Sequence, residues 1–236
     1  MSDLTGEARA RYVRRMFGRI APRYDLLNRL ITFGLDRRWR VELVRRLDLS
    51  SAPCVLDLGA GTGDLAFEVL KRRPAARLLA LDFTPEMMRI GQRRPGGERV
   101  LWVVADAARL PLPGRAVDGA VSGFLLRNVP EIDRVLSEER RVLRPGGCVA
   151  SLDTTPPPRS WLRPFISFQL HTVIPLLGRI LAGDSEAYTY LPQSTERFVD
   201  ADSLAERMTA AGFRQVGFAR RMLGTVALHW GTRPTD

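Results

Sequence analysis

The sequence lacks the features that mark secreted or membrane-spanning chains. Among its 236 residues only two are cysteine, Cys54 and Cys148, and each begins an apolar run without metal-ligand spacing. This pattern favours small buried side chains over a disulfide or a metal site. No apolar segment follows a basic start, and no stretch of about 18 uninterrupted apolar residues occurs. These absences predict a cytoplasmic protein without a metal centre.

Lysine is also nearly absent, although the chain is strongly basic. Lys71 is the one lysine among 36 Lys and Arg residues, and the formal net charge is +10. The arginines are scattered along the chain, often in pairs such as Arg14-Arg15 and Arg140-Arg141, rather than gathered in one run. A concentrated basic stripe would indicate nucleic acid, so this distribution is only weak evidence for an anionic partner.

Apolar periodicity predicts strands that alternate with helices after a helical N-terminal segment. The expected strands cover 54–58, 78–82, 100–105, 118–122, 148–152, 214–219 and 224–230. The expected helices cover 65–72, 85–94, 132–143 and 201–211, and Arg-Pro-Gly-Gly at 144–147 is typical of a helix end. Strands alternating with helices predict a doubly wound, mostly parallel seven-stranded sheet of the α/β class.

The length suits one domain with additions to a central core. We expect an N-terminal helical cap at 1–50, a ligand-binding core at 51–153, a helical insertion at 154–200 and a C-terminal helix with antiparallel strands at 201–236. The tripeptide Pro-Pro-Pro at 156–158 marks the connection into the insertion.

Three alternating glycines, Gly59, Gly61 and Gly63, follow the first expected strand. Their spacing differs from the G-x-G-x-x-G turn of dinucleotide-binding proteins, and the flanking carboxylates of Asp57 and Asp64 would repel a pyrophosphate. Carboxylates at this turn suit a ligand that carries an amino group and a sulfonium beside a ribose.

Further acids follow the next two strands. Asp82 closes the second strand, where it is placed to accept both ribose hydroxyls, and Asp106 with Ala107 follows the third, where an adenine amino group would be read. The ordered set resembles the class I S-adenosylmethionine-dependent methyltransferases. The resemblance implies S-adenosyl-L-methionine as the cofactor, held by Asp57, Gly59, Gly61, Thr62, Gly63, Asp82, Phe83, Asp106, Ala107, Ser122 and Gly123.

The stretch at the end of the fourth strand, SGFLLRNV at Ser122–Val129, limits the classes of molecule that could accept the methyl group. It lacks the Asn/Asp-Pro-Pro-aromatic motif that often accompanies amino-group methylation of bases or proteins, and it lacks a cysteine for pyrimidine C5 chemistry. Ribose methylation of the Lys-Asp-Lys-Glu type needs two lysines, and this chain has one. RNA is therefore only an alternative acceptor, and we expect no nucleic-acid partner.

Three segments make the resemblance narrower: MFGRIAPRYDLLNRLITFGLDRRWR at 16–40, LLRNV at 125–129, and DSEAYTYLPQS at 184–194 followed by AGF and GTVALHWG. They resemble the UbiE/MenG family of bacterial quinone-biosynthesis C-methyltransferases, in register from about Val13 to Gly231. The family usually reads S-F-G-L-R-N after the fourth strand. Here Gly123 stands for the serine and Leu125 for the glycine.

The resemblance implies methylation of a ring carbon of a reduced polyprenyl quinol, most typically demethylmenaquinol to menaquinol. It marks Tyr24, Arg127 and Asn128 as the catalytic set. Arg127 would stabilise the developing phenolate, because arginine stays protonated and is a poor base. Asn128 and Tyr24 would hydrogen-bond the ring oxygens. The residues expected to bind the substrate are Tyr188, Tyr190, Phe165, Leu170 and Val173.

An apolar stripe at 162–177, with residues at three- and four-residue spacing, favours either core packing or a channel for the prenyl tail. Arginines beside it leave open a peripheral contact with the inner face of a membrane, and a homodimer is also left open. Two alternatives to the quinol enzyme remain. One is a methyltransferase for another aromatic small molecule of secondary metabolism, and the other is a non-catalytic lipid-binding or scaffold protein. His171 and His229 are expected to be structural.

Overall fold

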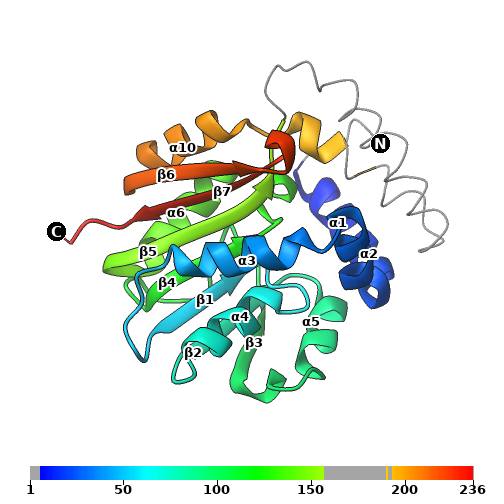
Figure 1. The fold of residues 1–236 in the computed structure, drawn as a ribbon, viewed down its shortest axis with the longest axis horizontal. Coiled ribbons are helices and arrows are strands. Elements are labelled where there is room, and N and C mark those ends of the chain that lie inside the picture. Colours follow the sequence, from blue (N-terminus) through cyan, green and yellow to red (C-terminus); the bar gives the residue numbers. More distant parts are fainter. Residues whose placement is uncertain (1–5, 157–189, 191–192, 236) are drawn as a thin grey trace.

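The computed structural model describes residues 6–156, 190 and 193–235. Within this part of the chain, seven strands form one sheet in the order β3-β2-β1-β4-β5-β7-β6 (Figure 1). Strand β7 runs antiparallel to β5 and to β6, and the other neighbours are parallel. The strands are β1 Cys54–Leu58, β2 Arg77–Asp82, β3 Val100–Val104, β4 Val117–Gly123, β5 Leu143–Thr154, β6 Arg214–Arg221 and β7 Val226–Thr232. The predicted seven-stranded, mostly parallel sheet is confirmed.

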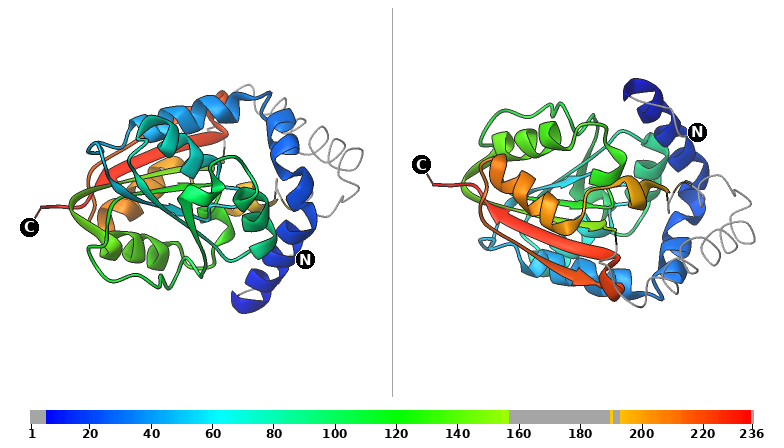
Figure 2. Two further views of the ribbon diagram at one scale, coloured as in Figure 1. Left: turned by 90° about the horizontal axis from the view of Figure 1, so that it is seen from below. Right: turned by 90° about the horizontal axis from the view of Figure 1, so that it is seen from above.

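Helices cover both faces of this sheet. They are α1 Gly6–Ile20, α2 Tyr24–Ile31, α3 Leu35–Arg45, α4 Asp64–Arg72, α5 Pro85–Gln92, α6 Ile132–Val142 and α10 Ala201–Ala210, with short 3-10 turns at Ala21–Arg23, Gly97–Arg99, Leu126–Asn128 and Met222–Gly224. Helices α3 and α4 pack on one face, and α6 and α10 pack on the other (Figures 1 and 2). Helices α1 and α2 form a smaller apolar cluster of their own.

Burial on both faces explains the near-continuous apolar strands. All five residues of β1 are buried, and the apolar side of α4 supplies Leu65, Ala66, Val69 and Leu70 to the core. Each fully buried leucine or valine contributes roughly 1.5 to 3 kcal/mol relative to exposure. Cys54 and Cys148 are both free and buried, as predicted.

Two predicted strands begin at other residues in the structure. Helix α6 ends at Val142, just before Arg-Pro-Gly-Gly as expected, but β5 begins at Leu143 rather than at Cys148. The Arg-Pro-Gly-Gly segment thus belongs to β5, with a register shift against β4 and a positive φ of 77° at Gly146. The last strand begins at Val226 rather than Gly224, because Leu223 adopts a left-handed φ of 55° within a 3-10 turn. Both misreadings arise at irregular backbone that periodicity does not encode.

The strand order creates a topological switch point at the carboxyl ends of the central strands. Strand β1 leads to β2 on one side, whereas β4 returns to its other side. Leu58 lies beside Leu81 and Ser122, so the carboxyl ends of β1, β2 and β4 meet at this point. Ligands of open parallel sheets bind in the crevice at such a point.

The predicted apolar stripe at 162–177 lies outside the described residues. Among the helices that the structure describes, none is long and apolar enough to cross a membrane.

Candidate active site

The glycine turn after β1 is a backbone arrangement that other residues would strain. Gly59, Gly61 and Gly63 have φ values of 66°, 55° and 84°, in the left-handed region. A Cβ on Gly59 would also come within 2.8 Å of a Leu125 methyl carbon. The turn leads directly into α4, so its backbone forms one wall of the crevice.

Asp82 at the end of β2 supports this turn. Its carboxylate accepts the Gly61 N–H at 2.8 Å through one oxygen and the Thr84 N–H at 2.7 Å through the other. Burial raises the pKa of Asp82, and these backbone hydrogen bonds oppose that shift. Both oxygens keep further lone pairs, because a carboxylate has about four acceptor sites. Asp82 is thus held in place and remains able to accept a ligand's hydroxyl groups.

Two adjoining cavities meet at the glycine turn. The residues that line the first cavity include Asp82, Phe83, Thr84, Ala105 and Ala107 at the ends of β2 and β3, together with Val13, Phe17, Leu125 and Asn128. The second is lined by Arg40, Asp57, Thr62, Asp64 and Leu65. Both share Tyr24, Gly59, Gly61, Gly123 and Phe124. One elongated ligand can therefore lie across the turn with its two ends in different surroundings.

One carboxylate oxygen of Asp57 is buried without a hydrogen-bond donor among the described residues. Its Oδ2 accepts the Ala66 N–H at 2.9 Å, whereas its Oδ1 is buried without a partner among the described residues. Burial raises the pKa of Asp57 to about 7. Most buried polar atoms are hydrogen-bonded, so the orphaned oxygen in a cavity wall indicates a missing donor.

Tyr24 begins α2 and borders both cavities. Burial raises its pKa, and the nearby charge of Arg127 opposes that rise without cancelling it. The phenol therefore stays protonated at neutral pH and is a hydrogen-bond donor toward the cavities.

Asn128 lies in the 3-10 turn after β4 and faces the first cavity. Its Nδ2 donates to the Phe124 carbonyl at 2.8 Å, and its Oδ1 accepts from the Tyr190 hydroxyl at 3.1 Å. An amide nitrogen has two hydrogens, so one remains for a ligand. Tyr190 in turn packs at a tilt against Tyr12 of α1, with ring centroids 6.0 Å apart.

Arg127 is not among the residues that line the two cavities. Its side chain is 6% exposed, and its guanidinium donates to Asp153 at 2.6 Å. It also lies 5.0 Å from the centre of the Phe124 ring, and its Nε is buried without a partner among the described residues. Arg127 can thus influence a ligand in the cavities by its positive charge and through its neighbours Tyr24 and Phe124, which line both cavities.

The remaining predicted residues are placed as follows. Thr62 lines the second cavity and donates to Asp25 at 2.8 Å, and Gly63 is the N-cap residue of α4. Ser122 is buried with an unpartnered Oγ, and Asp106 is exposed and accepts the Ala108 N–H. Tyr188, Phe165, Leu170 and Val173 lie outside the described residues. His229 is buried with Nε2 2.8 Å from the Ala201 carbonyl oxygen, which is a structural role as predicted.

Sequence reasoning missed Val13, Phe17, Arg40 and Asp153. The first three come from the N-terminal helices, which periodicity identifies without showing what they cover. Asp153 is the last residue but one of β5, as Asp57 is of β1, and Asp82 ends β2, so the repetition of acids near strand ends was an available signal.

These residues fit S-adenosylmethionine. Asp82 suits a ribose, the glycine turn lets a ligand approach the backbone closely, and the orphaned Asp57 oxygen suits an amino group. With the switch-point sheet, this arrangement is that of a class I S-adenosylmethionine-dependent methyltransferase.

Comparison with known proteins identifies the family within this class of methyltransferases. The model of the ubiE/COQ5 methyltransferase family matches residues 5–233, and the chain belongs to that family. The Ubiquinone/menaquinone biosynthesis C-methyltransferase UbiE of Desulfotalea psychrophila is 42% identical over 221 residues, covering 94% of this chain and 90% of the relative. The Demethylmenaquinone methyltransferase of Thermus thermophilus is 42% identical over 222 residues, covering 93% and 100%.

A solved structure shows the same fold. A methyltransferase of Thermotoga maritima, described as a possible histamine N-methyltransferase, has a TM-score of 0.66 at 18% identity and covers 93% of this chain and 98% of its own. The cofactor that the sequence predicted, S-adenosyl-L-methionine, agrees with the family.

Proposed function

We propose that this protein transfers a methyl group from S-adenosylmethionine to a ring carbon of demethylmenaquinol, which yields menaquinol. The observation that carries the proposal is the first cavity. It joins the cofactor side, at Asp82 and Gly59, to an apolar wall of Val13 and Phe17 with two polar groups, Tyr24 and Asn128. Apolar walls with a few placed polar groups suit a flat ring that bears oxygens. The names of the relatives from Thermus thermophilus and Desulfotalea psychrophila support the same substrate class.

When bound, S-adenosylmethionine supplies an electrophilic methyl group on a positively charged sulfur. The protein must hold the acceptor carbon in line with it and raise the nucleophilicity of that carbon. A quinol carbon becomes more nucleophilic as its neighbouring hydroxyl loses a proton. Tyr24 and Asn128 would orient the ring by donating hydrogen bonds to its oxygens.

Arg127 would stabilise the negative charge that develops on the quinol oxygen. Its ion pair with Asp153 fixes the guanidinium, and burial keeps its field from being screened by water. Its charge already opposes the burial-induced rise in the pKa of Tyr24, so it acts on the same place through a neighbour. Since arginine stays protonated, we assign it no role as a base.

A peripheral membrane contact belongs to the same proposal, because a polyprenyl quinol resides in a bilayer. The formal charge of +10 favours an anionic lipid surface.

The test is methyl transfer from labelled S-adenosylmethionine to chemically reduced acceptors in detergent. Demethylmenaquinol should accept the label on a ring carbon, as mass spectrometry of the product would show. Reduced benzoquinol precursors and non-prenylated aromatic rings are the comparison arms. Preferred labelling of either would replace the proposed acceptor, and cofactor binding without transfer to any quinol would contradict the proposed reaction.

A further inference from the structure

Three arginines gather at the end of the sheet opposite the two cavities, where β4 and β5 begin. Arg140 belongs to the last turn of α6, Arg233 follows β7, and Arg115 lies shortly before β4. Arg233 donates to the Arg140 carbonyl at 2.8 Å, and the Arg115 N–H donates to the Arg141 carbonyl at 3.0 Å. All three residues therefore converge on the carboxyl end of α6, and we call them the arginine cluster.

The charges of the arginine cluster are not compensated by acids. None of its three side chains is ion-paired with a carboxylate among the described residues, whereas Arg141 in the same turn of α6 pairs with Glu138 at 2.6 Å. Burial and the like charges of Arg115 and Arg140 lower the pKa of Arg233. The cluster is thus a place of mutual repulsion that an anion would relieve.

Backbone contacts hold the cluster in place. The Nη1 of Arg233 donates to three carbonyl groups around the end of α6, which leaves its Nε and Nη2 without a partner in the described part of the chain. The Nε of Arg140 is buried and also lacks a described partner, and a Cβ on Gly212 would come within 2.8 Å of it. Arg115 adopts a left-handed φ of 59°, and such strain in non-glycine residues is concentrated at ligand-binding positions.

The end of a helix accounts for one of these cations at most. The carboxyl end of a helix carries about half a negative charge, and Arg233 already satisfies the carbonyl groups there. The remaining guanidinium N–H groups suit an oxyanion, because their forked geometry matches phosphate oxygens.

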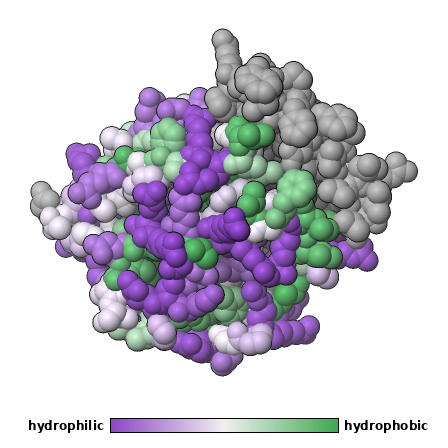
Figure 3. Space-filling view, viewed as in Figure 1, coloured by the Kyte–Doolittle hydropathy of each residue, from purple (hydrophilic) through white to green (hydrophobic). Residues whose placement is uncertain are grey.

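A soluble phosphate compound fits this place better than a lipid surface. Peripheral membrane binding combines basic charge with exposed apolar side chains. The large apolar side chains that are exposed in the described residues lie on other elements, several of them at the corner of α1 and α2 (Figure 3): Leu26, Leu30, Phe33, Leu101, Val104 and Leu223.

We propose that Arg115, Arg140 and Arg233 form a second binding site, which takes the phosphate groups of a soluble molecule. The guanidinium groups donate hydrogen bonds to the phosphate oxygens, and the bound negative charge offsets the repulsion among the three arginines. Because the ligand binds the folded chain, it should raise Tm. The site lies at the opposite end of the sheet from the methyl-donor cavities and does not depend on the proposed function.

Inorganic pyrophosphate is the probe, since it places two phosphate groups side by side. Calorimetric titration should show that the parent binds it more tightly than inorganic phosphate, and thermal melting should show a rise in Tm that potassium chloride of equal ionic strength does not give. Arg115→Gln and Arg140→Gln should each weaken pyrophosphate binding about 10-fold or more, because each removes charged donors. Neither side chain donates a hydrogen bond to a described group, so both variants should fold.

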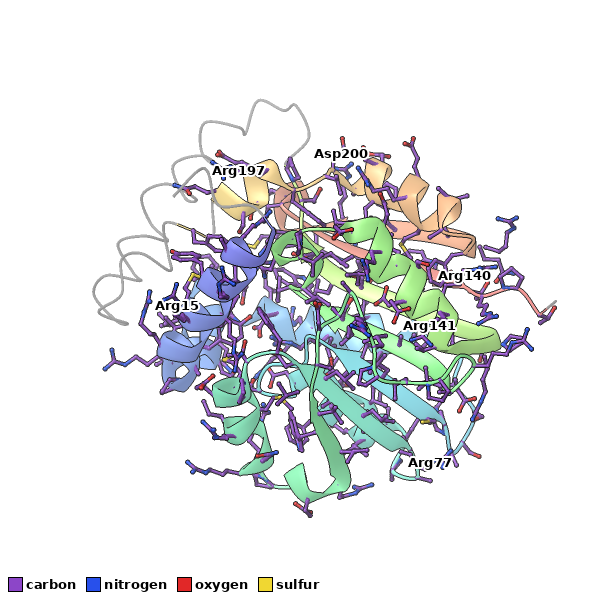
Figure 4. All side chains as sticks on the ribbon, turned by 180° about the vertical axis from the view of Figure 1, so that it is seen from behind. Arg15, Arg77, Arg140, Arg141, Arg197 and Asp200 are labelled. Atoms are coloured by element: carbon purple, nitrogen blue, oxygen red, sulfur yellow. The ribbon has the colours of Figure 1, made fainter. Side chains whose placement is uncertain are left out.

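Arg77→Gln is the matched control. Arg77 is exposed at the start of β2, away from Arg140 (Figure 4), and its replacement lowers the net charge by the same amount. It should bind pyrophosphate within about twofold of the parent, because exposed charges far apart are screened. Equal weakening in all three variants would indicate general attraction to a basic surface and would overturn the proposal, as would a parent that does not bind pyrophosphate.

Vesicles distinguish the two sources of phosphate. Arg115→Gln and Arg140→Gln should sediment with phosphatidylglycerol vesicles as the parent does. If they lose vesicle binding but retain pyrophosphate binding, the cluster contacts lipid headgroups and the proposed soluble ligand is wrong.

Discussion

Single residues in this site serve the fold and the ligand together, and Asp82 is an example. The sequence predicted it as a ribose acceptor, and the structure adds that it holds the N–H groups of Gly61 and Thr84. A change at Asp82 therefore alters the turn as well as the ligand contact.

We predict that Asp82→Ala weakens S-adenosylhomocysteine binding by about 1.5 to 3 kcal/mol, because the ligand loses hydrogen bonds to a charged acceptor. It should also lower Tm by several degrees, because two backbone N–H groups lose their acceptor. Calorimetry and thermal melting check both effects. Asp133→Ala removes an exposed, ion-paired acid of α6 and should change neither. An unaltered affinity in Asp82→Ala would remove Asp82 from the binding site.

A change at Arg127 also affects both catalysis and stability, because removing its charge leaves Asp153 buried and unpaired. We predict that Arg127→Met lowers kcat by about 10²- to 10³-fold, the range for losing one group that stabilises developing charge. It should also lower Tm, since an unpaired buried carboxylate is strongly destabilising. Single-turnover methylation and thermal melting measure the two effects.

A double variant separates catalysis from folding at Arg127. Adding Asp153→Asn to Arg127→Met removes the orphaned charge, and the amide oxygen can still accept one of the two backbone N–H groups, of Arg127 and Thr154, that the carboxylate accepts. Part of the lost Tm should therefore return. The turnover should stay low. Recovery of turnover along with Tm would show that Arg127 only anchors the loop after β4.

Because the pKa of Asp57 is raised, we predict that cofactor binding depends on pH. Its pKa is raised to about 7 by burial, and the charged groups that face it are Asp82 of β2, Asp64 of α4 and Arg40 of α3. A ligand ammonium favours the ionised carboxylate, so S-adenosylhomocysteine affinity should rise as pH increases from 5.5 through 7 and then level off. Titration of 5′-methylthioadenosine, which has no ammonium, should give a flat profile, as should Asp57→Asn. Equal slopes for the two ligands would assign the titration to another group.

At the scale of elements, α6 shows how a helix can carry a destabilising group. Its buried face consists of Val135, Leu136, Glu139 and Val142, at positions that periodicity assigns to the core. Both oxygens of Glu139 are buried without partners among the described residues, and burial raises its pKa to about 8.

We predict that Glu139→Met becomes progressively more stable than the parent as pH rises from 5 to 8. Below the unfolded pKa, Glu139 is protonated in both states. Between there and about pH 8 the unfolded state ionises while the folded state holds its proton, so the parent loses stability through this range and no further above it. The gain from Glu139→Met should reach the order of 4 kcal/mol by pH 8. Urea unfolding at three pH values measures it.

The neighbouring Glu138 supplies a control of opposite sign. A hydrogen bond from Arg141 holds its pKa below the usual range, so its contribution is fully present from pH 5 upward. Glu138→Gln should therefore lose a constant amount of stability between pH 5 and 8. If the two variants show the same pH dependence, Glu139 does not carry a shifted proton in the folded state.

The whole molecule presents its charge on all sides. Figure 4 shows Arg15, Arg77 and Arg140 on different elements around the outside, and Figure 3 shows polar residues over most of one face, with apolar residues gathered at the corner of α1 and α2. In α2 and the turn after it, Leu26, Leu30 and Phe33 are 55%, 40% and 76% exposed. Basic charge around exposed apolar side chains is typical of peripheral binding to anionic bilayers.

We predict that the protein sediments with vesicles containing about one-third phosphatidylglycerol at low ionic strength and is released in about 0.5 M salt, because the attraction is screened. Phosphatidylcholine vesicles should retain much less protein. Phe33→Ser should reduce binding to the anionic vesicles. Leu101→Ser, at an exposed leucine of the β3 edge strand, should have little effect. Salt-independent or equal binding to both vesicles would contradict an electrostatic contact.

The sequence by itself determined the order of the elements, the sheet class, the glycine turn and the acids at the ends of β1 and β2. These features depend on local periodicity and turn chemistry, which a few neighbouring residues encode. Only the tertiary structure decided that Arg127 pairs with Asp153 and that Arg40 lies in the same cavity as Asp57. Those juxtapositions join residues 26 or 17 positions apart, and they follow from β5 pairing beside β4 and from α3 packing near the start of α4. Because strand order and helix docking depend on burying the whole core at once, no local pattern specifies which of many arginines meets which carboxylate.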